Sequence, residues 1–485
     1  MDANVRCLLE GENAVKVALG KPQMPPHAVG PNHLRGSEKF QKAAHHELDN
    51  VTKRRNLNYA TTTIRVKRQN AVDELDDWQD LRDTGSAVKK DVMSRLPELL
   101  EEFERNVTAR GGHVHWARDS KEANEIIARL IEETGEKNVV KIKSMATQEI
   151  ALNEELEKRG IFAQETDLAE LIVQLGEDFP SHILVPAIHR NRAEIRDIFV
   201  NKMPNTDDTL TNDPSELADA ARSYLREQFM KAKVAISGVN FGIAETGTVS
   251  IVESEGNGRM CLTLPETLIS VMGIEKLLPS FDDLGVFLQL LPRSSTAERM
   301  NPYTSLWTGV TEGDGPKNFH IVLLDNGRTA AMSNEIGREA LKCIRCSACL
   351  NVCPVYERAG GHSYGSTYPG PIGAILTPQL TGIDSASDPN SSLPFASSLC
   401  GRCNEVCPVK IPITDILLEL RYQKAKNEPT RWEQTAFSAI SLLWGKPALW
   451  NRAVRMVALG RVLGGFNGTI DTMPPPISGW TQYRD

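Results

Sequence analysis

The spacing of apolar and polar residues changes several times along the chain, and these changes divide it into regions. Residues 1–38 show no sustained period and are rich in proline and glycine, so we expect an irregular leader. Residues 71–103 have helical spacing and follow a basic stretch, so we expect a helical arm at residues 39–110. Over residues 111–330, short β-type runs alternate with amphipathic stretches. This alternation predicts an α/β domain built on an open, largely parallel sheet.

The clearest helix predicted in the α/β region covers residues 119–135. Asp119 and Glu122 have the spacing of a capping box, and Gly135 can end the helix. The β-type runs predict strands at residues 113–117, 138–143, 161–165, 182–187, 233–238, 247–254, 286–291 and 320–327.

Composition narrows the function classes. The 485 residues carry a formal charge of −8, which gives no support to nucleic-acid binding. No apolar run is long enough for a membrane span, and the N-terminus does not have the pattern of a secretion signal. We therefore expect a cytoplasmic protein.

Basic residues gather in two places. One is the run around Lys53, and the other is the segment 421–485, which we expect to form an amphipathic tail. Residues 421–466 hold eight basic and two acidic side chains. Such surfaces can face solvent, dock a partner subunit or make a peripheral contact with an anionic membrane.

Cysteines are concentrated in one region. Of nine in the chain, Cys7 and Cys261 are isolated, and the other seven lie between residues 343 and 407. The run "CIRCSACLNVCPVY" from Cys343 has the spacing C-x2-C-x2-C-x3-C-P, which is typical of two-cluster ferredoxins. Zinc knuckles are the alternative, but they separate two cysteine pairs by a longer loop. We expect a small helical, dicluster ferredoxin-like domain at residues 335–420.

The ferredoxin pattern assigns the thiols to two clusters. The second cysteine group has the spacing of the last three cysteines of the same run, with Ser397 where the first would stand. One 4Fe-4S cluster then takes Cys343, Cys346, Cys349 and Cys407, and the other takes Cys353, Cys400 and Cys403. The second cluster is either completed by Ser397, Ser398, water or a partner's side chain, or is a 3Fe-4S cluster.

Two segments of the α/β region are candidates for ligand binding. One is a glycine-rich turn beside a carboxylate, comprising Gly242, Glu245, Thr246, Gly247 and Thr248. Its backbone N–H groups can bind a phosphate or carboxylate, although a tight turn with local hydrogen bonds explains the same pattern. The other is Lys143 and Ser144, which follow a predicted strand. A helix cap is the alternative role there.

Some chemically active side chains have simpler explanations. His113 and His115 share a strand face without a third ligand at suitable spacing, so we interpret them as structural. The same holds for His182 and His189. Cys261 lies in an apolar run and is expected in the core.

The sequence "FGIAETGTVSIVE", followed by the two cysteine groups and "YPGPIGA" between them, resembles the lactate-utilisation iron–sulfur proteins. These are B subunits of bacterial L-lactate oxidation systems. The resemblance implies a LUD-type domain at 111–330, similar in fold to CoA transferases and sugar-phosphate isomerases. It also implies a seven-cysteine dicluster domain, two partner subunits and a role in passing electrons to an acceptor during the oxidation of L-lactate to pyruvate. A glutamate is the nucleophile in the similar CoA transferases, which makes Glu245 a weak catalytic candidate.

Lactate oxidation removes two electrons, usually as a hydride taken by an organic cofactor. The chain has neither a GxGxxG dinucleotide fingerprint nor a P-loop. We therefore expect an electron-transfer subunit with an acceptor that the sequence does not name. Two alternatives are a catalytic α/β domain that uses the clusters as its redox outlet, and a sensor or scaffold with structural clusters.

Overall fold

The computed structural model describes residues 25–204, 206–383, 387–427 and 431–457. The chain divides into two compact units, Met1–Arg421 and Tyr422–Asp485. Residues 25–38, the described part of the expected leader, contain no helix or strand. Residues 1–24, with the isolated Cys7, and the end of the tail beyond residue 457 lie outside the described residues. Among the described helices, none has the length and apolar character needed to cross a membrane.

The first unit is built on a six-stranded parallel sheet with the strand order β1-β10-β7-β4-β2-β3. This confirms the predicted α/β class. The strands are β1 (His113–Ala117), β2 (Asn138–Lys141), β3 (Phe162–Glu165), β4 (Val234–Gly238), β7 (Thr267–Gly273) and β10 (Asn318–Leu324). The chain runs outward from β2 to β3, and in the opposite direction from β4 through β7 to β10. The topological switch point therefore lies between β2 and β4.

Both faces of this sheet are buried, which explains its continuous apolar strands. Along β4, Val234 and Ile236 join a core with helix α5 (Ser120–Glu132), whereas Ala235 joins the larger core on the other face. Helix α5 begins as predicted, because the Asp119 carboxylate accepts a hydrogen bond from the Glu122 N–H. The other helices of this region are α6 (Met145–Glu149), α7 (Leu152–Glu157), α8 (Leu168–Leu175), α9 (Arg192–Lys202), α10 (Pro214–Lys231), α11 (Asn257–Thr263), α12 (Phe281–Ser295) and α13 (Arg328–Met332).

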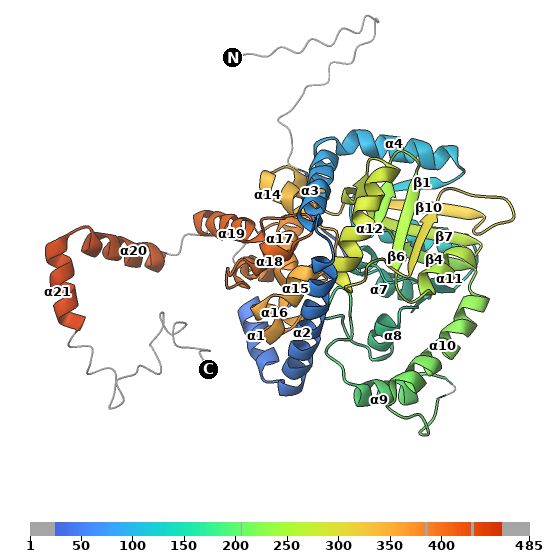
Figure 1. The fold of residues 1–485 in the computed structure, drawn as a ribbon, viewed down its shortest axis with the longest axis horizontal. Coiled ribbons are helices and arrows are strands. Elements are labelled where there is room, and N and C mark those ends of the chain that lie inside the picture. Colours follow the sequence, from blue (N-terminus) through green and yellow to red (C-terminus); the bar gives the residue numbers. More distant parts are fainter. Residues whose placement is uncertain (1–24, 205, 384–386, 428–430, 458–485) are drawn as a thin grey trace, which may run out of the picture. The chain divides into compact units, whose positions relative to one another are not determined.

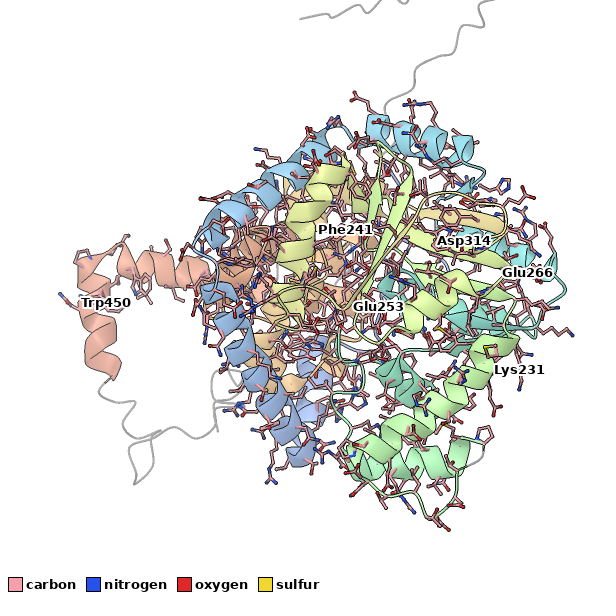
Figure 2. All side chains as sticks on the ribbon, turned by 45° about the vertical axis from the view of Figure 1, so that its right-hand side comes forward. Lys231, Phe241, Glu253, Glu266, Asp314 and Trp450 are labelled. Atoms are coloured by element: carbon pink, nitrogen blue, oxygen red, sulfur yellow. The ribbon has the colours of Figure 1, made fainter. Side chains whose placement is uncertain are left out.

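A smaller mixed sheet, with the order β8-β5-β6-β9, was not predicted as a separate layer. Its strands are β5 (Phe241–Ile243), β6 (Thr248–Glu253), β8 (Leu277–Leu278) and β9 (Tyr303–Trp307). In Figure 2, Lys231 and Glu266, which precede β4 and β7, lie at the right-hand rim of the molecule, whereas Glu253 at the end of β6 lies nearer its middle.

Two strand predictions are wrong. Residues 286–291 lie inside α12, where Leu284, Phe287 and Leu291 are buried at helical spacing and a Ser280–Asp283 capping box begins the helix. Residues 182–187 form turns rather than a strand. Short apolar runs do not by themselves distinguish a strand from a buried helix.

The helical arm packs against the cysteine region. It consists of α1 (Phe40–Leu48), α2 (Val51–Asp73), α3 (Trp78–Ser94) and α4 (Leu96–Ala109). Helix α2 contacts α15 (Ala348–Asn351) and α16 (Pro354–Ala359), and α3 contacts α14 (Glu335–Leu341), as Figure 1 shows. The remaining elements of the cysteine region are the 3-10 turns η2 (His362–Tyr364) and η3 (Pro389–Phe395) with helices α17 (Gly370–Thr381), α18 (Arg402–Val406) and α19 (Ile413–Asn427).

The segment between the two cysteine groups is rich in glycine, proline and serine, a composition typical of linkers, yet it is packed into the cysteine region. It contains α17, all of whose residues are buried. Small residues permit this close packing, since a Cβ atom at Gly370 would meet Leu350 Cγ at 2.6 Å. The segment thus belongs to the core of the cysteine region.

The second unit contains α20 (Arg431–Trp444) and α21 (Pro447–Val457), which contact each other. Trp444 and Trp450 meet edge to face, with ring centroids 6.2 Å apart. Both helices lie in the segment that we expected to form an amphipathic tail.

Candidate functional site

Four thiols of the cysteine region surround one small cavity. Cys343, Cys346, Cys349 and Cys407 line it together with apolar side chains such as Ile372. These are the four cysteines that the ferredoxin spacing groups together. A set of converging sulfur atoms with an apolar surround suits an iron–sulfur cluster, because thiolate is the ligand that such clusters require.

The backbone around this first thiol set is shaped for sulfur ligands. The N–H of Arg345 donates to Cys343 Sγ, and the N–H of Ile411 donates to Cys407 Sγ, both at 3.4 Å. Arg345 and Ser347 have φ of 62° and 59°, which lets the loop turn tightly between its cysteines. Burial raises the pKa of Cys407 to about 11, and it raises the pKa of Cys346 as well. The thiolate forms therefore require a compensating positive charge, which bound iron supplies.

The second thiol set lies nearer the surface. Cys353 and Cys403 are buried, whereas Cys400 is exposed. The three thiols lie within electrostatic range of one another. The Oγ of Ser397 accepts a hydrogen bond from the Leu399 N–H at 3.1 Å, so this hydroxyl already has a partner in the structure.

Two buried arginines of the arm approach the first thiol set, and sequence reasoning missed both. Arg82 of α3 donates to the carbonyl oxygen of Cys407 from Nε at 3.0 Å and from Nη2 at 2.8 Å. Arg68 of α2 donates to the carbonyl oxygen of Val406 at 3.0 Å and interacts electrostatically with Cys346 and Cys407. Nothing in the local sequence marked them, because charged residues are common on helices.

The switch point of the large sheet forms a crevice at the carboxyl ends of its strands. Lys143 and Ser144 follow β2, and Gly238 ends β4 beside them. A Cβ atom at Gly238 would meet Ser144 Oγ at 2.5 Å, so the close approach of these two segments requires glycine. Open α/β sheets bind ligands at such switch points.

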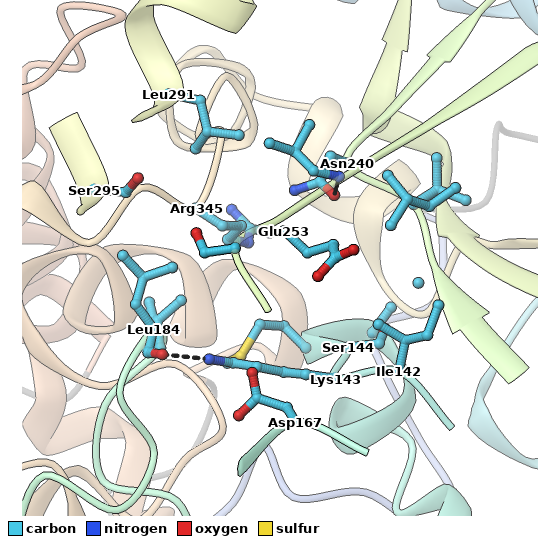
Figure 3. Close-up of a pocket in the computed structure, with 18 of the residues that line it drawn as sticks. Ile142, Lys143, Ser144, Asp167, Leu184, Asn240, Glu253, Leu291, Ser295 and Arg345 are labelled. Carbon is cyan, nitrogen blue, oxygen red and sulfur yellow. Dashed lines mark hydrogen bonds between the residues drawn. The ribbon is translucent and has the colours of Figure 1, made fainter. Parts of the chain in front are cut away.

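A cavity of about 400 Å³ opens from this crevice. Figure 3 shows Lys143, Asn240 and Arg345 among its lining residues, which come from different parts of the chain. Lys143 Nζ donates to the carbonyl oxygen of Leu184 at 2.6 Å. The volume falls in the range of small-molecule sites. The lining thus combines the predicted pair Lys143 and Ser144 with residues that were not predicted.

A buried ionic network joins this cavity to the first thiol set. Arg328 donates to Glu149 at 2.9 and 3.0 Å and to Glu275 at 2.6 Å. The other oxygen of Glu275 accepts from Arg345 at 3.1 Å. Tyr368 donates to Glu149 at 2.6 Å, and its ring lies 4.6 Å from the Arg345 guanidinium carbon.

The network keeps the Glu275 carboxylate ionised. Burial alone would raise the pKa of Glu275, but Arg328 and Arg345 lower it to about 2. Arg345 stands between Cys343 and Cys346 in the sequence, so one residue connects the cysteine loop with the cavity. The sequence shows a basic residue, Arg345, inside "CIRC". Only the fold shows that Glu275 and Tyr368 are its partners.

The glycine-rich turn has a different place. Glu245 is exposed, and its Oε2 accepts from the Phe281 N–H at 3.0 Å, at the start of α12. Gly247 has φ of 66°, and a Cβ atom there would meet the backbone N of Val107 at 2.5 Å. Gly242, Glu245, Thr246, Gly247 and Thr248 do not line the cavity that contains Lys143 and Ser144.

The side chains interpreted as structural are packed or hydrogen-bonded. His182 Nε2 lies 3.1 Å from Asn351 Oδ1, and burial lowers the pKa of His182 to about 4. His189 Nε2 lies 2.8 Å from Asp178 Oδ2, and His115 Nε2 lies 3.1 Å from His320 Nδ1. Cys261 is fully buried, which confirms its predicted core position.

Comparison with known proteins agrees with this architecture. Residues 100–324 match the LUD domain family, and residues 339–411 match the 4Fe-4S dicluster domain family. The second match shows that the cysteine region is an iron–sulfur domain. A solved DUF162 family protein from Deinococcus radiodurans covers 47% of this chain and 98% of its own, at 12% identity and a TM-score of 0.27.

Curated relatives match nearly the whole chain. Lactate utilization protein B of Bacillus licheniformis and that of Bacillus subtilis are each 41% identical over 456 residues, covering 93% of this chain and 94% of the relative. The protein of the same name from Oceanobacillus iheyensis is 40% identical, covering 90% of this chain and 91% of its own. The chain therefore belongs to the lactate utilization protein B family.

Proposed function

We propose that this protein is the iron–sulfur electron-transfer subunit of a system that oxidises L-lactate to pyruvate. The observation that carries the proposal is the pair of thiol sets, one enclosed beside the α/β cavity and the other reaching the surface at Cys400. Membership of the lactate utilization protein B family supports the substrate, since the relatives are named for lactate utilization.

We assign Cys343, Cys346, Cys349 and Cys407 to one cluster, and Cys353, Cys400 and Cys403 to the other. A bound iron–sulfur cluster accepts and releases one electron at a time. The exposed Cys400 leaves the second set accessible, so solvent or a partner's side chain can supply the missing ligand there. Ser397 is a further candidate, since its hydroxyl oxygen accepts the Leu399 N–H and keeps a lone pair.

Residues around the first thiol set would stabilise the negative charge that a bound cluster gains on reduction. Two backbone N–H groups point at the sulfurs of Cys343 and Cys407. The buried guanidinium groups of Arg68 and Arg82 lie close by. Positive charge and N–H dipoles in a low-dielectric interior stabilise added negative charge, so these groups favour the reduced state.

Hydride removal belongs to another component in this proposal. The sequence has no fingerprint for a nicotinamide or nucleotide cofactor. We therefore place the protein with two other lactate-utilisation subunits in the cytoplasm, where it receives electrons from one partner and passes them to an acceptor.

The proposal is tested by Cys346→Ser in the anaerobically purified complex. We expect the iron content per chain to fall from about eight to about four, since one cluster of a dicluster domain is lost. Lactate-dependent reduction of an artificial acceptor should fall with it. Cys261→Ala is the matched control, because it removes a buried thiol outside the cysteine region.

The contrary result is equally clear. If the complex oxidises lactate at the wild-type rate after Cys346→Ser, with the cluster shown by EPR to be absent, electron transfer through this site is excluded. A sensor or scaffold role would then be the better explanation of the clusters.

A further inference from the structure

One lysine of the α/β cavity is held in place, but its ammonium has no hydrogen-bond partner among the described residues. Lys276 follows β7 and lines the cavity. The preceding residue, Glu275, is held by two sets of hydrogen bonds. Its carbonyl oxygen accepts from Lys89 Nζ at 2.5 Å, and its carboxylate accepts from Arg328 and Arg345. Within the described part of the chain, the Lys276 ammonium makes no hydrogen bond or salt bridge.

The other cations of the cavity are engaged. Arg328 and Arg345 are in the ionic network, and Lys143 donates to the Leu184 carbonyl oxygen. Burial and the neighbouring Arg345 lower the pKa of Lys276 to about 8. Its amine is therefore still mainly protonated at neutral pH.

The carboxylates of the cavity are engaged as well, mostly by backbone N–H groups. Glu253 accepts from Gly256 and Arg259, and Asp167 accepts from Ala169. Glu255 accepts from the Leu168 N–H, and Glu275 is bound by arginines. These contacts leave the Lys276 ammonium as the cavity cation without a hydrogen-bond partner among the described residues.

We propose that the cavity binds a small organic acid of the 2-hydroxy or 2-oxo class, with the acid's carboxylate held by the Lys276 ammonium. The anion site follows from the geometry, whereas the class of acid rests on the proposed function. Leu184, Val185, Ile251 and Leu291 supply an apolar wall for the alkyl part of the acid.

The proposed acid site lies close to the first thiol set, which is the proposed electron-transfer site. Arg345 lines the cavity and also donates its backbone N–H to Cys343 Sγ. The Lys276 ammonium interacts electrostatically with Cys343. An acid bound at Lys276 therefore lies beside the first thiol set rather than beside the exposed second set.

Binding is measured by calorimetry on the anaerobically purified full chain with its clusters, with no electron donor present. The ligands are L-lactate, pyruvate and the neutral amide lactamide. We expect the wild type to bind both acids, and to bind lactamide at least about tenfold more weakly, because a charge-assisted contact is lost.

The variant Lys276→Met should weaken acid binding by a similar factor, and Lys276→Arg should retain most of the affinity. Lys90→Met, at an exposed position, is the matched control and should bind as the wild type does.

A second measurement uses the wild type alone and does not depend on how a variant folds. Saturating pyruvate should slow acetylation of Lys276 by a small amine-reactive reagent, followed by mass spectrometry. Acetylation of Lys90 should be unchanged.

Three results with the wild type would overturn the proposal: no binding of either acid, equal binding of lactamide, or no protection of Lys276 by pyruvate. Equal acid affinity in a Lys276→Met protein with full iron content would do so too. None of these results would contradict the electron-transfer proposal, which is tested separately with Cys346→Ser. Conversely, acid binding can persist in a chain that does not transfer electrons.

Discussion

At the scale of single residues, buried charges connect the α/β cavity with the cysteine loop. Arg345 donates its backbone N–H to a cysteine sulfur, binds Glu275 and stacks over Tyr368. In the sequence it is one of two residues between Cys343 and Cys346. The ligand spacing is local and could be predicted, but the role of Arg345 could not, because its partners lie far away in the chain.

Glu149 offers a direct test of the network. It is fully buried and accepts hydrogen bonds from Asn326, Arg328 and Tyr368. Glu149→Gln removes the charge and places an N–H group where these donors point. We expect the free energy of unfolding to fall by about 3 kcal/mol, since the Arg328 charge loses one of its two carboxylates. Urea unfolding of the wild type and the variant measures this loss.

Asp219→Asn is the control for that experiment. It breaks a pair with Arg222 whose two side chains are mostly exposed, and exposed pairs contribute little. If Glu149→Gln cost no more than Asp219→Asn, the network would not be a source of stability.

At the scale of elements, the arm helices support the cysteine region rather than standing apart from it. Helices α2 and α3 bring Arg68 and Arg82 to the carbonyl oxygens next to and at Cys407. The helical spacing of α3 was predictable, because a stripe with period 3.6 is a local signal, whereas α2 lies mostly in a basic stretch. Which surface the stripe covers depends on tertiary packing. The apolar run at 286–291 shows the same limit, since its length suits either a strand or a buried helix.

Arg82→Met tests the support that α3 gives. The substitution keeps much of the side chain's bulk but removes the two donors to the Cys407 carbonyl oxygen. We expect iron release to a chelator to be about tenfold faster, because the turn that presents Cys407 loses charge-assisted hydrogen bonds. Release is followed anaerobically by the absorbance of the clusters.

Arg222→Met on α10 is the matched control, since it removes an exposed arginine from a helix outside the cysteine region. Equal release rates for the two variants would show that Arg82 does not protect the site.

At the scale of the whole molecule, the candidate cluster ligands and the α/β cavity lie in the first unit and not in the second. The seven clustered cysteines and the α/β cavity all belong to the unit Met1–Arg421. The second unit carries exposed apolar residues on α20, among them Phe437 and Trp444. We propose that this basic, amphipathic unit is separable from the iron–sulfur site.

A chain that ends after Asn427 tests this division. It retains α19 whole and removes α20 and α21. We expect iron content and the midpoint of thermal unfolding to match those of the full chain, because no described residue of the site is removed. Loss of iron on truncation would instead show that the second unit is needed to hold the clusters.

The sequence by itself determined the α/β class, the presence of an iron–sulfur domain and the helical character of the arm. Strand and helix periods, and ligand spacing within a loop, are local properties that a linear pattern records. It did not determine the small mixed sheet, the buried α17, or the meeting of Lys276, Glu275 and Arg328 with Arg345. Those depend on which strand ends and loops come together in space, and only the tertiary structure decides that.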